Sequence, residues 1–353
     1  MILEKSARQE TGPRVAAPAA RDASAAAHEA LLALGRALIG TGYRWVCPTP
    51  ETQALVNARP GNERAHDLRG VFGWSRPFAA SDAAALPPPL LALIRQAGAL
   101  ERLAGNGALC RSRVRFSSFS DTLLAHSAWP TTQVGAVFFG PDTYRFAALI
   151  ERVLAEHGRR SHTPRTAPCK VVDLGCGSGA GGILAARLIG HELPTRVLFT
   201  DINPEALRLA AVNAQLAGLE HYECRRSDVL AAVDEPVDLV LANPPYLLDA
   251  KERAYRHGGG QLGTGLALRI VDESLQRLAP GGRLILYTAA PVVAGIDLLW
   301  QALAPRLTKA AASRGAVYDY AEIDPDVFGA ELAQPGYGDV ERLAVAGLSV
   351  QVR

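Results

Sequence analysis

Residues 171–179 have the sequence Val-Val-Asp-Leu-Gly-Cys-Gly-Ser-Gly. The apolar start indicates a buried strand, and the alternating glycines Gly175, Gly177 and Gly179 indicate a tight turn into a helix of small residues. A strand, a glycine turn and a helix in this order let backbone approach a nucleotide-like ligand closely. Because a glycine turn also occurs without any ligand, the assignment needs a second signal.

The second signal lies about seventy residues later. Residues 237–242, Val-Asp-Leu-Val-Leu-Ala, indicate a buried parallel strand, and Asn243-Pro244-Pro245-Tyr246 follows it directly. Open α/β sheets bind ligands at the carboxyl ends of their strands, so both stretches are expected at one edge. Further strands are expected near 196–201, 221–226 and 283–289, with helices between them. This alternation predicts an α/β fold with a doubly wound, Rossmann-like parallel sheet.

Together the two stretches resemble the class I S-adenosylmethionine-dependent methyltransferases, in the Asn-Pro-Pro-Tyr branch that methylates planar nitrogen. The resemblance covers residues 137–290. Pro141, Asp142 and Thr143 are similar to part of the Pro-x-Pro-(Glu/Asp)-Thr-Glu element of the glutamine N5-methyltransferases. The resemblance implies S-adenosyl-L-methionine as the cofactor and Thr143 at its cleft. It also implies an antiparallel strand pair formed by residues 316–323 and 342–352.

A long glycine-rich loop, residues 247–264, follows the Asn-Pro-Pro-Tyr element. Its Tyr255-Arg256-His257 and the later Gly263-Thr264-Gly265-Leu266 are similar to elements of the ribosomal-protein glutamine methyltransferases. Gly258-Gly259 stands where that family has Glu-Pro. Loops of this length in compact domains are usually lids or binding loops.

Carboxylates are expected to bind the cofactor at the strand ends. Asp201 ends the second strand at a spacing from Gly179 that suits a ribose ligand, and Ile202 is assigned to the same site. Asn203 is expected to cap the next helix. The resemblance implies that Asp228 contacts the adenine amino group. Asp173 either orients the glycine loop or receives the cofactor's amino group.

Asn243, Pro244 and Tyr246 are the expected catalytic residues. Asn243 is also expected to line the cofactor site, as are Gly175, Gly177 and Gly179. An amide nitrogen is a poor nucleophile because its lone pair is delocalised. Hydrogen bonds from both N–H groups to the Asn243 side-chain oxygen and the Pro244 carbonyl would pyramidalise the nitrogen and direct its lone pair to the methyl group. Tyr246 could stack on the planar substrate and face the sulfonium. Orientation and exclusion of water would then do most of the catalysis.

A protein glutamine is the leading methyl acceptor. An RNA or DNA base with an exocyclic amine has the same planar geometry and is an alternative, as is a small-molecule amine or amide. A cofactor-binding module without turnover is a further alternative. The intact Asn-Pro-Pro-Tyr element argues against it, because binding alone does not require that element.

The 353 residues suggest about two domains. We expect a disordered tail over 1–26, a small and mostly helical substrate-recognition domain over 27–136 that is compatible with a winged-helix-like module, and the methyltransferase domain over 137–353. Residues 1–168 hold 20 Lys and Arg against 13 Asp and Glu, an excess of positive charge that suits an anionic partner.

A strand expected over residues 109–119 would place Arg111, Arg113 and Arg115 on one face. Such a stripe could meet nucleic-acid phosphates or an acidic protein, and it is equally consistent with a solvated surface.

Five scattered cysteines without Cys-x-x-Cys spacing indicate neither a disulfide framework nor a metal site. No apolar run is long enough to cross a bilayer, so we expect a cytoplasmic protein that does not bind membranes. The sequence does not indicate an oligomeric state.

Overall fold

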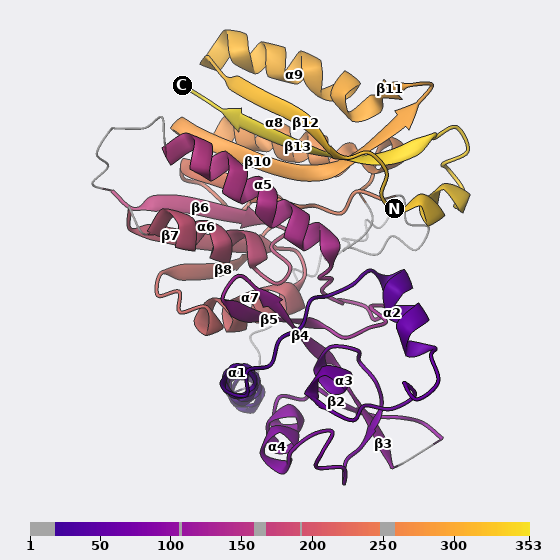
Figure 1. Cartoon of the computed structure of the whole chain (residues 1–353). Helices are drawn as coiled ribbons and strands as arrows, with labels where there is room; N and C mark the ends of the chain where they lie inside the picture. The colour runs from indigo at the N-terminus through magenta and orange to yellow at the C-terminus, as the bar shows by residue number, and fades with distance from the viewer. Residues whose placement is uncertain (1–17, 106–107, 159–166, 191–192, 248–257) are drawn as a thin grey trace, which may run out of the picture.

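The structure is a computed structural model that describes residues 18–105, 108–158, 167–190, 193–247 and 258–353. Figure 1 shows a larger α/β part, formed by the C-terminal two thirds of the chain, and a smaller part formed by the N-terminal elements. The two parts are in direct contact through the helix α7 (Pro204–Leu216) and the hairpin that precedes the larger part.

The larger part is built on a mixed sheet with the strand order β12-β13-β10-β9-β6-β7-β8. These strands are β6 (Cys169–Leu174), β7 (Thr195–Asp201), β8 (Tyr222–Arg226), β9 (Val237–Ala242), β10 (Leu278–Val293), β12 (Val317–Asp324) and β13 (Arg342–Gln351), and β11 (Ile296–Asp297) pairs with β10. The strands from β10 to β8 are parallel, whereas β13 is antiparallel to both of its neighbours. The predicted doubly wound sheet with an antiparallel C-terminal pair is confirmed.

Helices cover both faces of the sheet (Figure 1). One face carries α5 (Pro141–Gly158), α6 (Ala180–Gly190) and α7, and the other carries α8 (Gly265–Arg277) and α9 (Leu298–Arg314). Neighbouring strand residues alternate between the two layers. Val171 packs in the cluster that contains Ile150 of α5, and Val172 packs in the cluster that contains Ile270 of α8.

The smaller part combines short helices with two small sheets. The helices are α1 (Pro18–Gly40), α2 (Pro50–Asn57), α3 (Leu68–Phe72) and α4 (Pro88–Gln96). One sheet has the order β1 (Phe78–Ala79), β3 (Leu109–Ser112), β2 (Leu100–Arg102), and the other is a hairpin of β4 (Val114–Phe119) and β5 (Thr122–Ser127). Two further 3-10 turns, η1 (Gln261–Gly263) and η2 (Gly329–Ala333), lie in the larger part.

The core of the smaller part continues into α7. Leu31 and Leu34 of α1 share a hydrophobic cluster with Leu209 and Val212 of α7. A Cβ atom at Gly35 of α1 would lie only 2.7 Å from the Leu216 side chain, so the two helices pack closely. Burial of this continuous apolar surface fixes the smaller part against the sheet domain.

Helix α1 begins at Pro18, so part of the segment expected to be disordered, residues 18–26, is helical instead. Alanine is the strongest helix former and proline is favoured in the first turn of a helix. These two preferences explain why this Ala-rich segment extends the amphipathic helix that was expected to start at residue 27.

The predicted single strand over residues 109–119 is two strands in different sheets. The chain bends between them at Arg113, where Ser112 Oγ donates to the Val114 carbonyl oxygen at 2.6 Å. Arg113 is exposed, but Arg115 is only 4% exposed and donates to Gln53 Oε1 at 3.1 Å. The predicted stripe of three arginines on one face is therefore wrong.

Candidate active site

A cavity of about 710 Å³ lies at the carboxyl ends of the adjacent parallel strands β9, β6, β7 and β8. This volume is typical of small-molecule and cofactor sites. The cavity is lined by the following residues of the predicted site: Thr143, Asp173, Gly175, Gly177, Asp201, Ile202, Asp228, Asn243, Pro244 and Tyr246. The fold thus brings together side chains that are a hundred residues apart in the sequence.

The glycine turn after β6 is shaped by backbone conformations that favour glycine. Gly175 has φ +58° and Gly177 has φ +52°. The Gly177 N–H donates to Asp201 Oδ2 at 3.1 Å, which ties the turn to the end of β7. Gly179 does not line the cavity, although it was assigned to the cofactor site. A Cβ atom there would lie 3.1 Å from the Phe199 ring, so Gly179 allows α6 to pack closely on β7.

Asp173 is buried beneath this turn with 2% of its surface exposed. Its Oδ2 accepts a hydrogen bond from the Gly182 N–H at 2.8 Å. Burial disfavours the charged carboxylate and raises the pKa of Asp173 to about 7. The hydrogen bond to the first turn of α6 is the contact expected of a residue that orients the glycine loop.

Asp201 and Asn203 connect three parts of the cavity wall. Asp201 Oδ1 accepts from the Asn203 N–H at 2.8 Å, and burial raises the pKa of Asp201. Asn203 caps α7, because its Oδ1 accepts from the Glu205 N–H at 3.0 Å; the predicted cap is confirmed. Asn203 Nδ2 also donates to the Gly135 carbonyl oxygen at 2.9 Å, so it holds the loop that contains Gly135 against the strand ends.

Asp142, on the first turn of α5, meets two tyrosines. Tyr287 Oη donates to Asp142 Oδ1 at 3.0 Å, and the Tyr246 hydroxyl also forms a hydrogen bond with Asp142. Burial raises the pKa of the Asp142 carboxyl and the pKa values of both phenols. Tyr246 is 8% exposed and its ring lies 6.1 Å from that of Phe328. The sequence places Asp142 beside Thr143 in the family-like element, but it did not predict these contacts with the two tyrosines.

The outer wall of the cavity comes from segments that sequence reasoning did not assign to it. Pro50, Glu51 and residues 129–136 line it from the smaller part, and Phe328 and Glu331 line it from the segment after β12. Phe328 and Glu331 belong to the connection between β12 and β13. No motif marks these residues, because their position depends on how distant elements pack.

Two glycines pack closely against the backbone of the Asn-Pro-Pro-Tyr element. A Cβ atom at Gly258 would lie 2.0 Å from the Gly263 carbonyl oxygen and 2.8 Å from that of Pro245, and one at Gly263 would lie 2.3 Å from the Tyr246 carbonyl oxygen. Glycine at position 258, where the resembled family has glutamate, is therefore a packing requirement of this chain. The family-like Tyr255-Arg256-His257 lies outside the described residues.

Among the described residues, no group of three or more His, Cys, Asp and Glu side chains could hold a metal ion. No helix in the described ranges is long and apolar enough to cross a membrane.

Residues 154–292 match a protein family described as the methyltransferase small domain. The release factor glutamine methyltransferase of Deinococcus radiodurans is 36% identical over 141 residues, which cover 37% of this chain and 48% of that protein. The protein of the same name from Cereibacter sphaeroides is 37% identical over 134 residues, which cover 34% of this chain and 46% of that protein. The matched region thus spans about half the length of these curated relatives.

Solved structures of other methyltransferases are loosely similar to this chain. The tRNA m1G37 methyltransferase of M. jannaschii has 16% sequence identity and a TM-score of 0.41, with 68% of this chain and 57% of that chain covered. A ribosomal protein L11 methylase from Lactobacillus delbrueckii has 24% identity and a TM-score of 0.35, with 61% and 81% covered. The match over residues 154–292 and the strand order of the sheet both point to a methyltransferase domain. The chain contains a class I S-adenosylmethionine-dependent methyltransferase domain that resembles the protein glutamine N5-methyltransferases.

Proposed function

We propose that this chain transfers a methyl group from S-adenosylmethionine to a planar amide nitrogen, and that the acceptor is a glutamine side chain in a protein. One observation carries the proposal: Asn243, Pro244 and Tyr246 line the same cavity as the glycine turn and the strand-end carboxylates. A shared cavity would bring methyl donor and acceptor together in one orientation, which is the main source of rate in such a transfer.

The residues around the cavity suit a cationic nucleoside. Asp201 would bind the ribose hydroxyls, Asp228 the adenine amino group, and Asp173 with Gly175, Gly177 and Thr143 would surround the amino-acid end. Carboxylates also offset the positive charge of a sulfonium. When bound, the cofactor supplies an electrophilic methyl group.

On the acceptor side, the Asn243 side-chain oxygen and the Pro244 carbonyl would accept both N–H groups of a primary amide. This arrangement directs the nitrogen lone pair to the methyl group, and the nitrogen releases a proton after it has gained the methyl group. Tyr246, whose hydroxyl is held by Asp142, would keep one side of the acceptor dry.

The smaller part, residues 27–136, is proposed to recognise the acceptor. Its Pro50, Glu51 and Trp129 line the outer cavity wall, and Val134, at the rim, has a fully exposed side chain. A peptide could therefore contact both parts of the molecule while its glutamine reaches Asn243.

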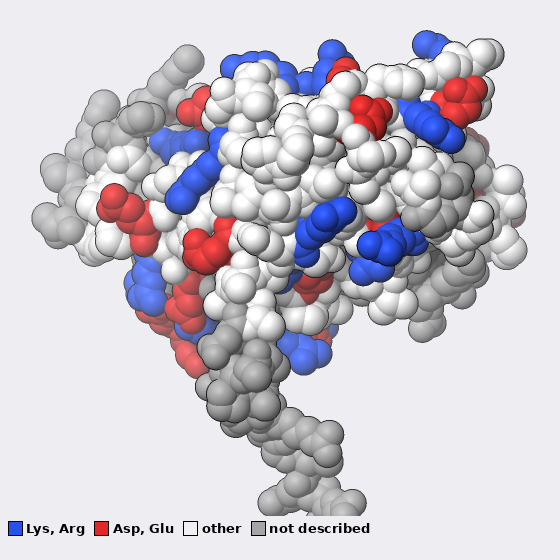
Figure 2. Space-filling model, turned by 90° about the horizontal axis from the view of Figure 1, so that it is seen from below, with Lys and Arg blue, Asp and Glu red and all other residues white. Residues whose placement is uncertain are grey.

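A nucleic-acid base as acceptor is the second outcome that the test must allow. On the face shown in Figure 2, basic and acidic side chains are scattered among uncharged ones. Arg115, one of the three arginines expected to meet phosphates, is buried and bonded to Gln53. These observations favour a protein acceptor.

The proposal is tested with methyl-labelled S-adenosylmethionine and two pools of acceptor. The purified protein is incubated with a cell extract depleted of nucleic acid, and separately with deproteinised RNA and DNA. Label in protein that survives nuclease supports the proposal, and digestion should then place the label on glutamine. Label only in RNA or DNA would show that a base amine is the acceptor. The Asn243→Ala variant should label neither pool.

A further inference from the structure

The turn that carries Asp228 toward the cavity has a strained backbone. Ser227, Asp228 and Val229 all line the cavity, and Val229 has φ +48°. A β-branched residue rarely adopts this left-handed conformation, which costs of the order of 1–3 kcal/mol. Within the turn, Ser227 Oγ donates to the Val229 carbonyl oxygen at 2.8 Å and accepts from the Ala232 N–H at 3.0 Å. Such a conformation persists only where its surroundings hold it.

Helix α8 holds the turn from one side. Glu273 Oε2 accepts from the Leu230 N–H at 3.0 Å, and Glu273 Oε1 accepts from Arg269 Nε at 2.7 Å. Arg269 Nη1 then donates to Asp228 Oδ1 at 2.9 Å. Helix α8 therefore binds this turn twice: Glu273 binds its backbone, and Arg269 binds the Asp228 carboxylate.

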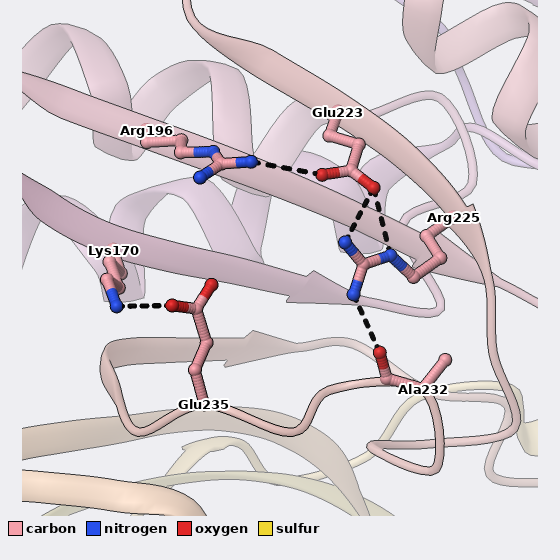
Figure 3. A network of polar contacts seen from close by, with 6 residues as sticks. All are labelled: Lys170, Arg196, Glu223, Arg225, Ala232 and Glu235. Carbon is pink, nitrogen blue, oxygen red and sulfur yellow. Dashed lines mark hydrogen bonds and ion pairs between the residues drawn. The ribbon is translucent and has the colours of Figure 1, made fainter.

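The sheet holds the residues that follow the turn, Ala232 and Glu235, as Figure 3 shows. Arg225 of β8 donates from Nη1 to the Ala232 carbonyl oxygen at 2.8 Å, and its Nε and Nη2 bond Glu223 Oε1 at 2.9 and 2.6 Å (Figure 3). Lys170 of β6 pairs with Glu235 further along the chain. With this end tied to β8 and β6, the contacts from α8 decide where Asp228 points.

Stability alone does not account for the pair between Arg269 and Asp228. Their side chains are 44% and 62% exposed, and exposed ion pairs contribute only about 0–1 kcal/mol. Arg269 bonds Asp228 Oδ1, and a carboxylate has a second oxygen that accepts hydrogen bonds. An exocyclic amine at the cavity wall requires an acceptor of this kind.

We propose that Glu273 and Arg269 are positioning residues, which hold the turn so that the second oxygen of Asp228 accepts from the amino group on C6 of the cofactor's purine. The inference rests on the proposed function, since it takes S-adenosylmethionine as the cofactor. It assigns to residues of α8 the discrimination between a 6-amino purine and a 6-oxo purine, whose oxygen would face the carboxylate with no proton to donate.

The test compares the dissociation constants of S-adenosylhomocysteine and of S-inosylhomocysteine, in which oxygen replaces the amino group, by calorimetry with the full chain. The wild-type protein should prefer the amino compound. Glu273→Ala should reduce this preference by about tenfold, mainly by weakening binding of the amino compound, because the Asp228 carboxylate is then no longer held toward the amino group. Glu273→Gln keeps an oxygen for the Leu230 N–H and should give an intermediate preference.

Asp272→Ala is the matched control. Asp272 is the neighbour of Glu273 on α8, but it pairs with Arg306 Nε of α9 at 3.1 Å and does not line the cavity. The Asp272→Ala substitution should leave the preference for the amino compound unchanged. Equal weakening of the binding of both compounds by Glu273→Ala, or no change in the binding of either, would overturn the inference.

If the wild-type protein bound neither compound, the cofactor assignment would be wrong and this inference with it. If it bound both compounds as expected but labelled no protein, only the proposed acceptor would be wrong.

Discussion

Asn213 of α7 donates from its Nδ2 to the Ser178 carbonyl oxygen over 2.8 Å. The same fully buried side chain exchanges two hydrogen bonds with the backbone of Ala125 in β5, at 2.7 and 2.9 Å. One amide therefore joins the hairpin of the smaller part to the glycine turn of the cavity. This contact makes the position of the turn depend on the packing of the N-terminal elements.

Asn213→Ala should destabilise the protein and weaken cofactor binding together. The substitution leaves the Ala125 N–H and two carbonyl oxygens without their partner, and we expect a loss of about 2–4 kcal/mol in the free energy of unfolding. Urea denaturation and the affinity for S-adenosylhomocysteine measure the two effects. Asn62→Ala is the control, because the Asn62 side chain donates to the nearby Val56 carbonyl oxygen and lies outside the cavity. Equal effects of the two variants would contradict this account of Asn213.

Asn243→Ala should abolish methyl transfer while leaving cofactor affinity nearly unchanged. The substitution removes the proposed acceptor for the substrate N–H, and loss of orientation costs at least about a hundredfold in rate. Single-turnover transfer of labelled methyl and calorimetry with S-adenosylhomocysteine separate the two quantities. A variant that methylates at the wild-type rate would show that the amide is positioned by another group.

Asp173 should make the stability of the protein depend on pH. Its pKa is about 7 in the folded protein and the ordinary value is 3.8, so the folded state retains a proton that the unfolded chain releases. Stability is therefore lost as the pH rises from about 4 to about 7, by up to about 4 kcal/mol.

Asp173→Asn cannot ionise and keeps an oxygen for the Gly182 N–H. Urea denaturation at pH 5, 6, 7 and 8 should show a smaller loss of stability for this variant than for the wild-type protein between pH 5 and 7. Parallel profiles of the two proteins would mean that Asp173 does not hold a proton in this range.

Gly258→Ala should reduce methyl transfer more than cofactor binding. Its methyl group would overlap the Gly263 carbonyl oxygen and press on the backbone of Pro245 and Tyr246, so the proposed acceptor site must shift. Gly259→Ala is a neighbouring control: Gly259 lies at positive φ, +64°, but no atom lies within 4 Å of its added Cβ. Ala in that conformation costs about 1–2 kcal/mol, which should affect stability and spare transfer. An equal loss of transfer in both variants, measured with labelled methyl groups, would show that the close contacts of Gly258 do not hold the acceptor site in place.

The sequence by itself determined the sheet and most of the site. Buried parallel strands such as 171–174 and 237–242 are apolar except for one aspartate each, and a glycine turn or the Asn-Pro-Pro-Tyr element follows directly. Residues at the carboxyl ends of adjacent parallel strands must meet at one edge, so Asp201, Asp228 and Asn243 could be assigned to one site before their distances were known.

Only the tertiary structure decided what surrounds that edge. Arg115 looks like a surface residue in the sequence, yet a bend at Arg113 turns it inward to Gln53. The contacts of Asp142 with Tyr287, and of Glu273 with the Leu230 N–H, join elements that no local pattern relates. Local sequence governs backbone conformation and the alternation of buried faces, whereas contacts between distant elements depend on how whole layers pack, and packing is a property of the complete core.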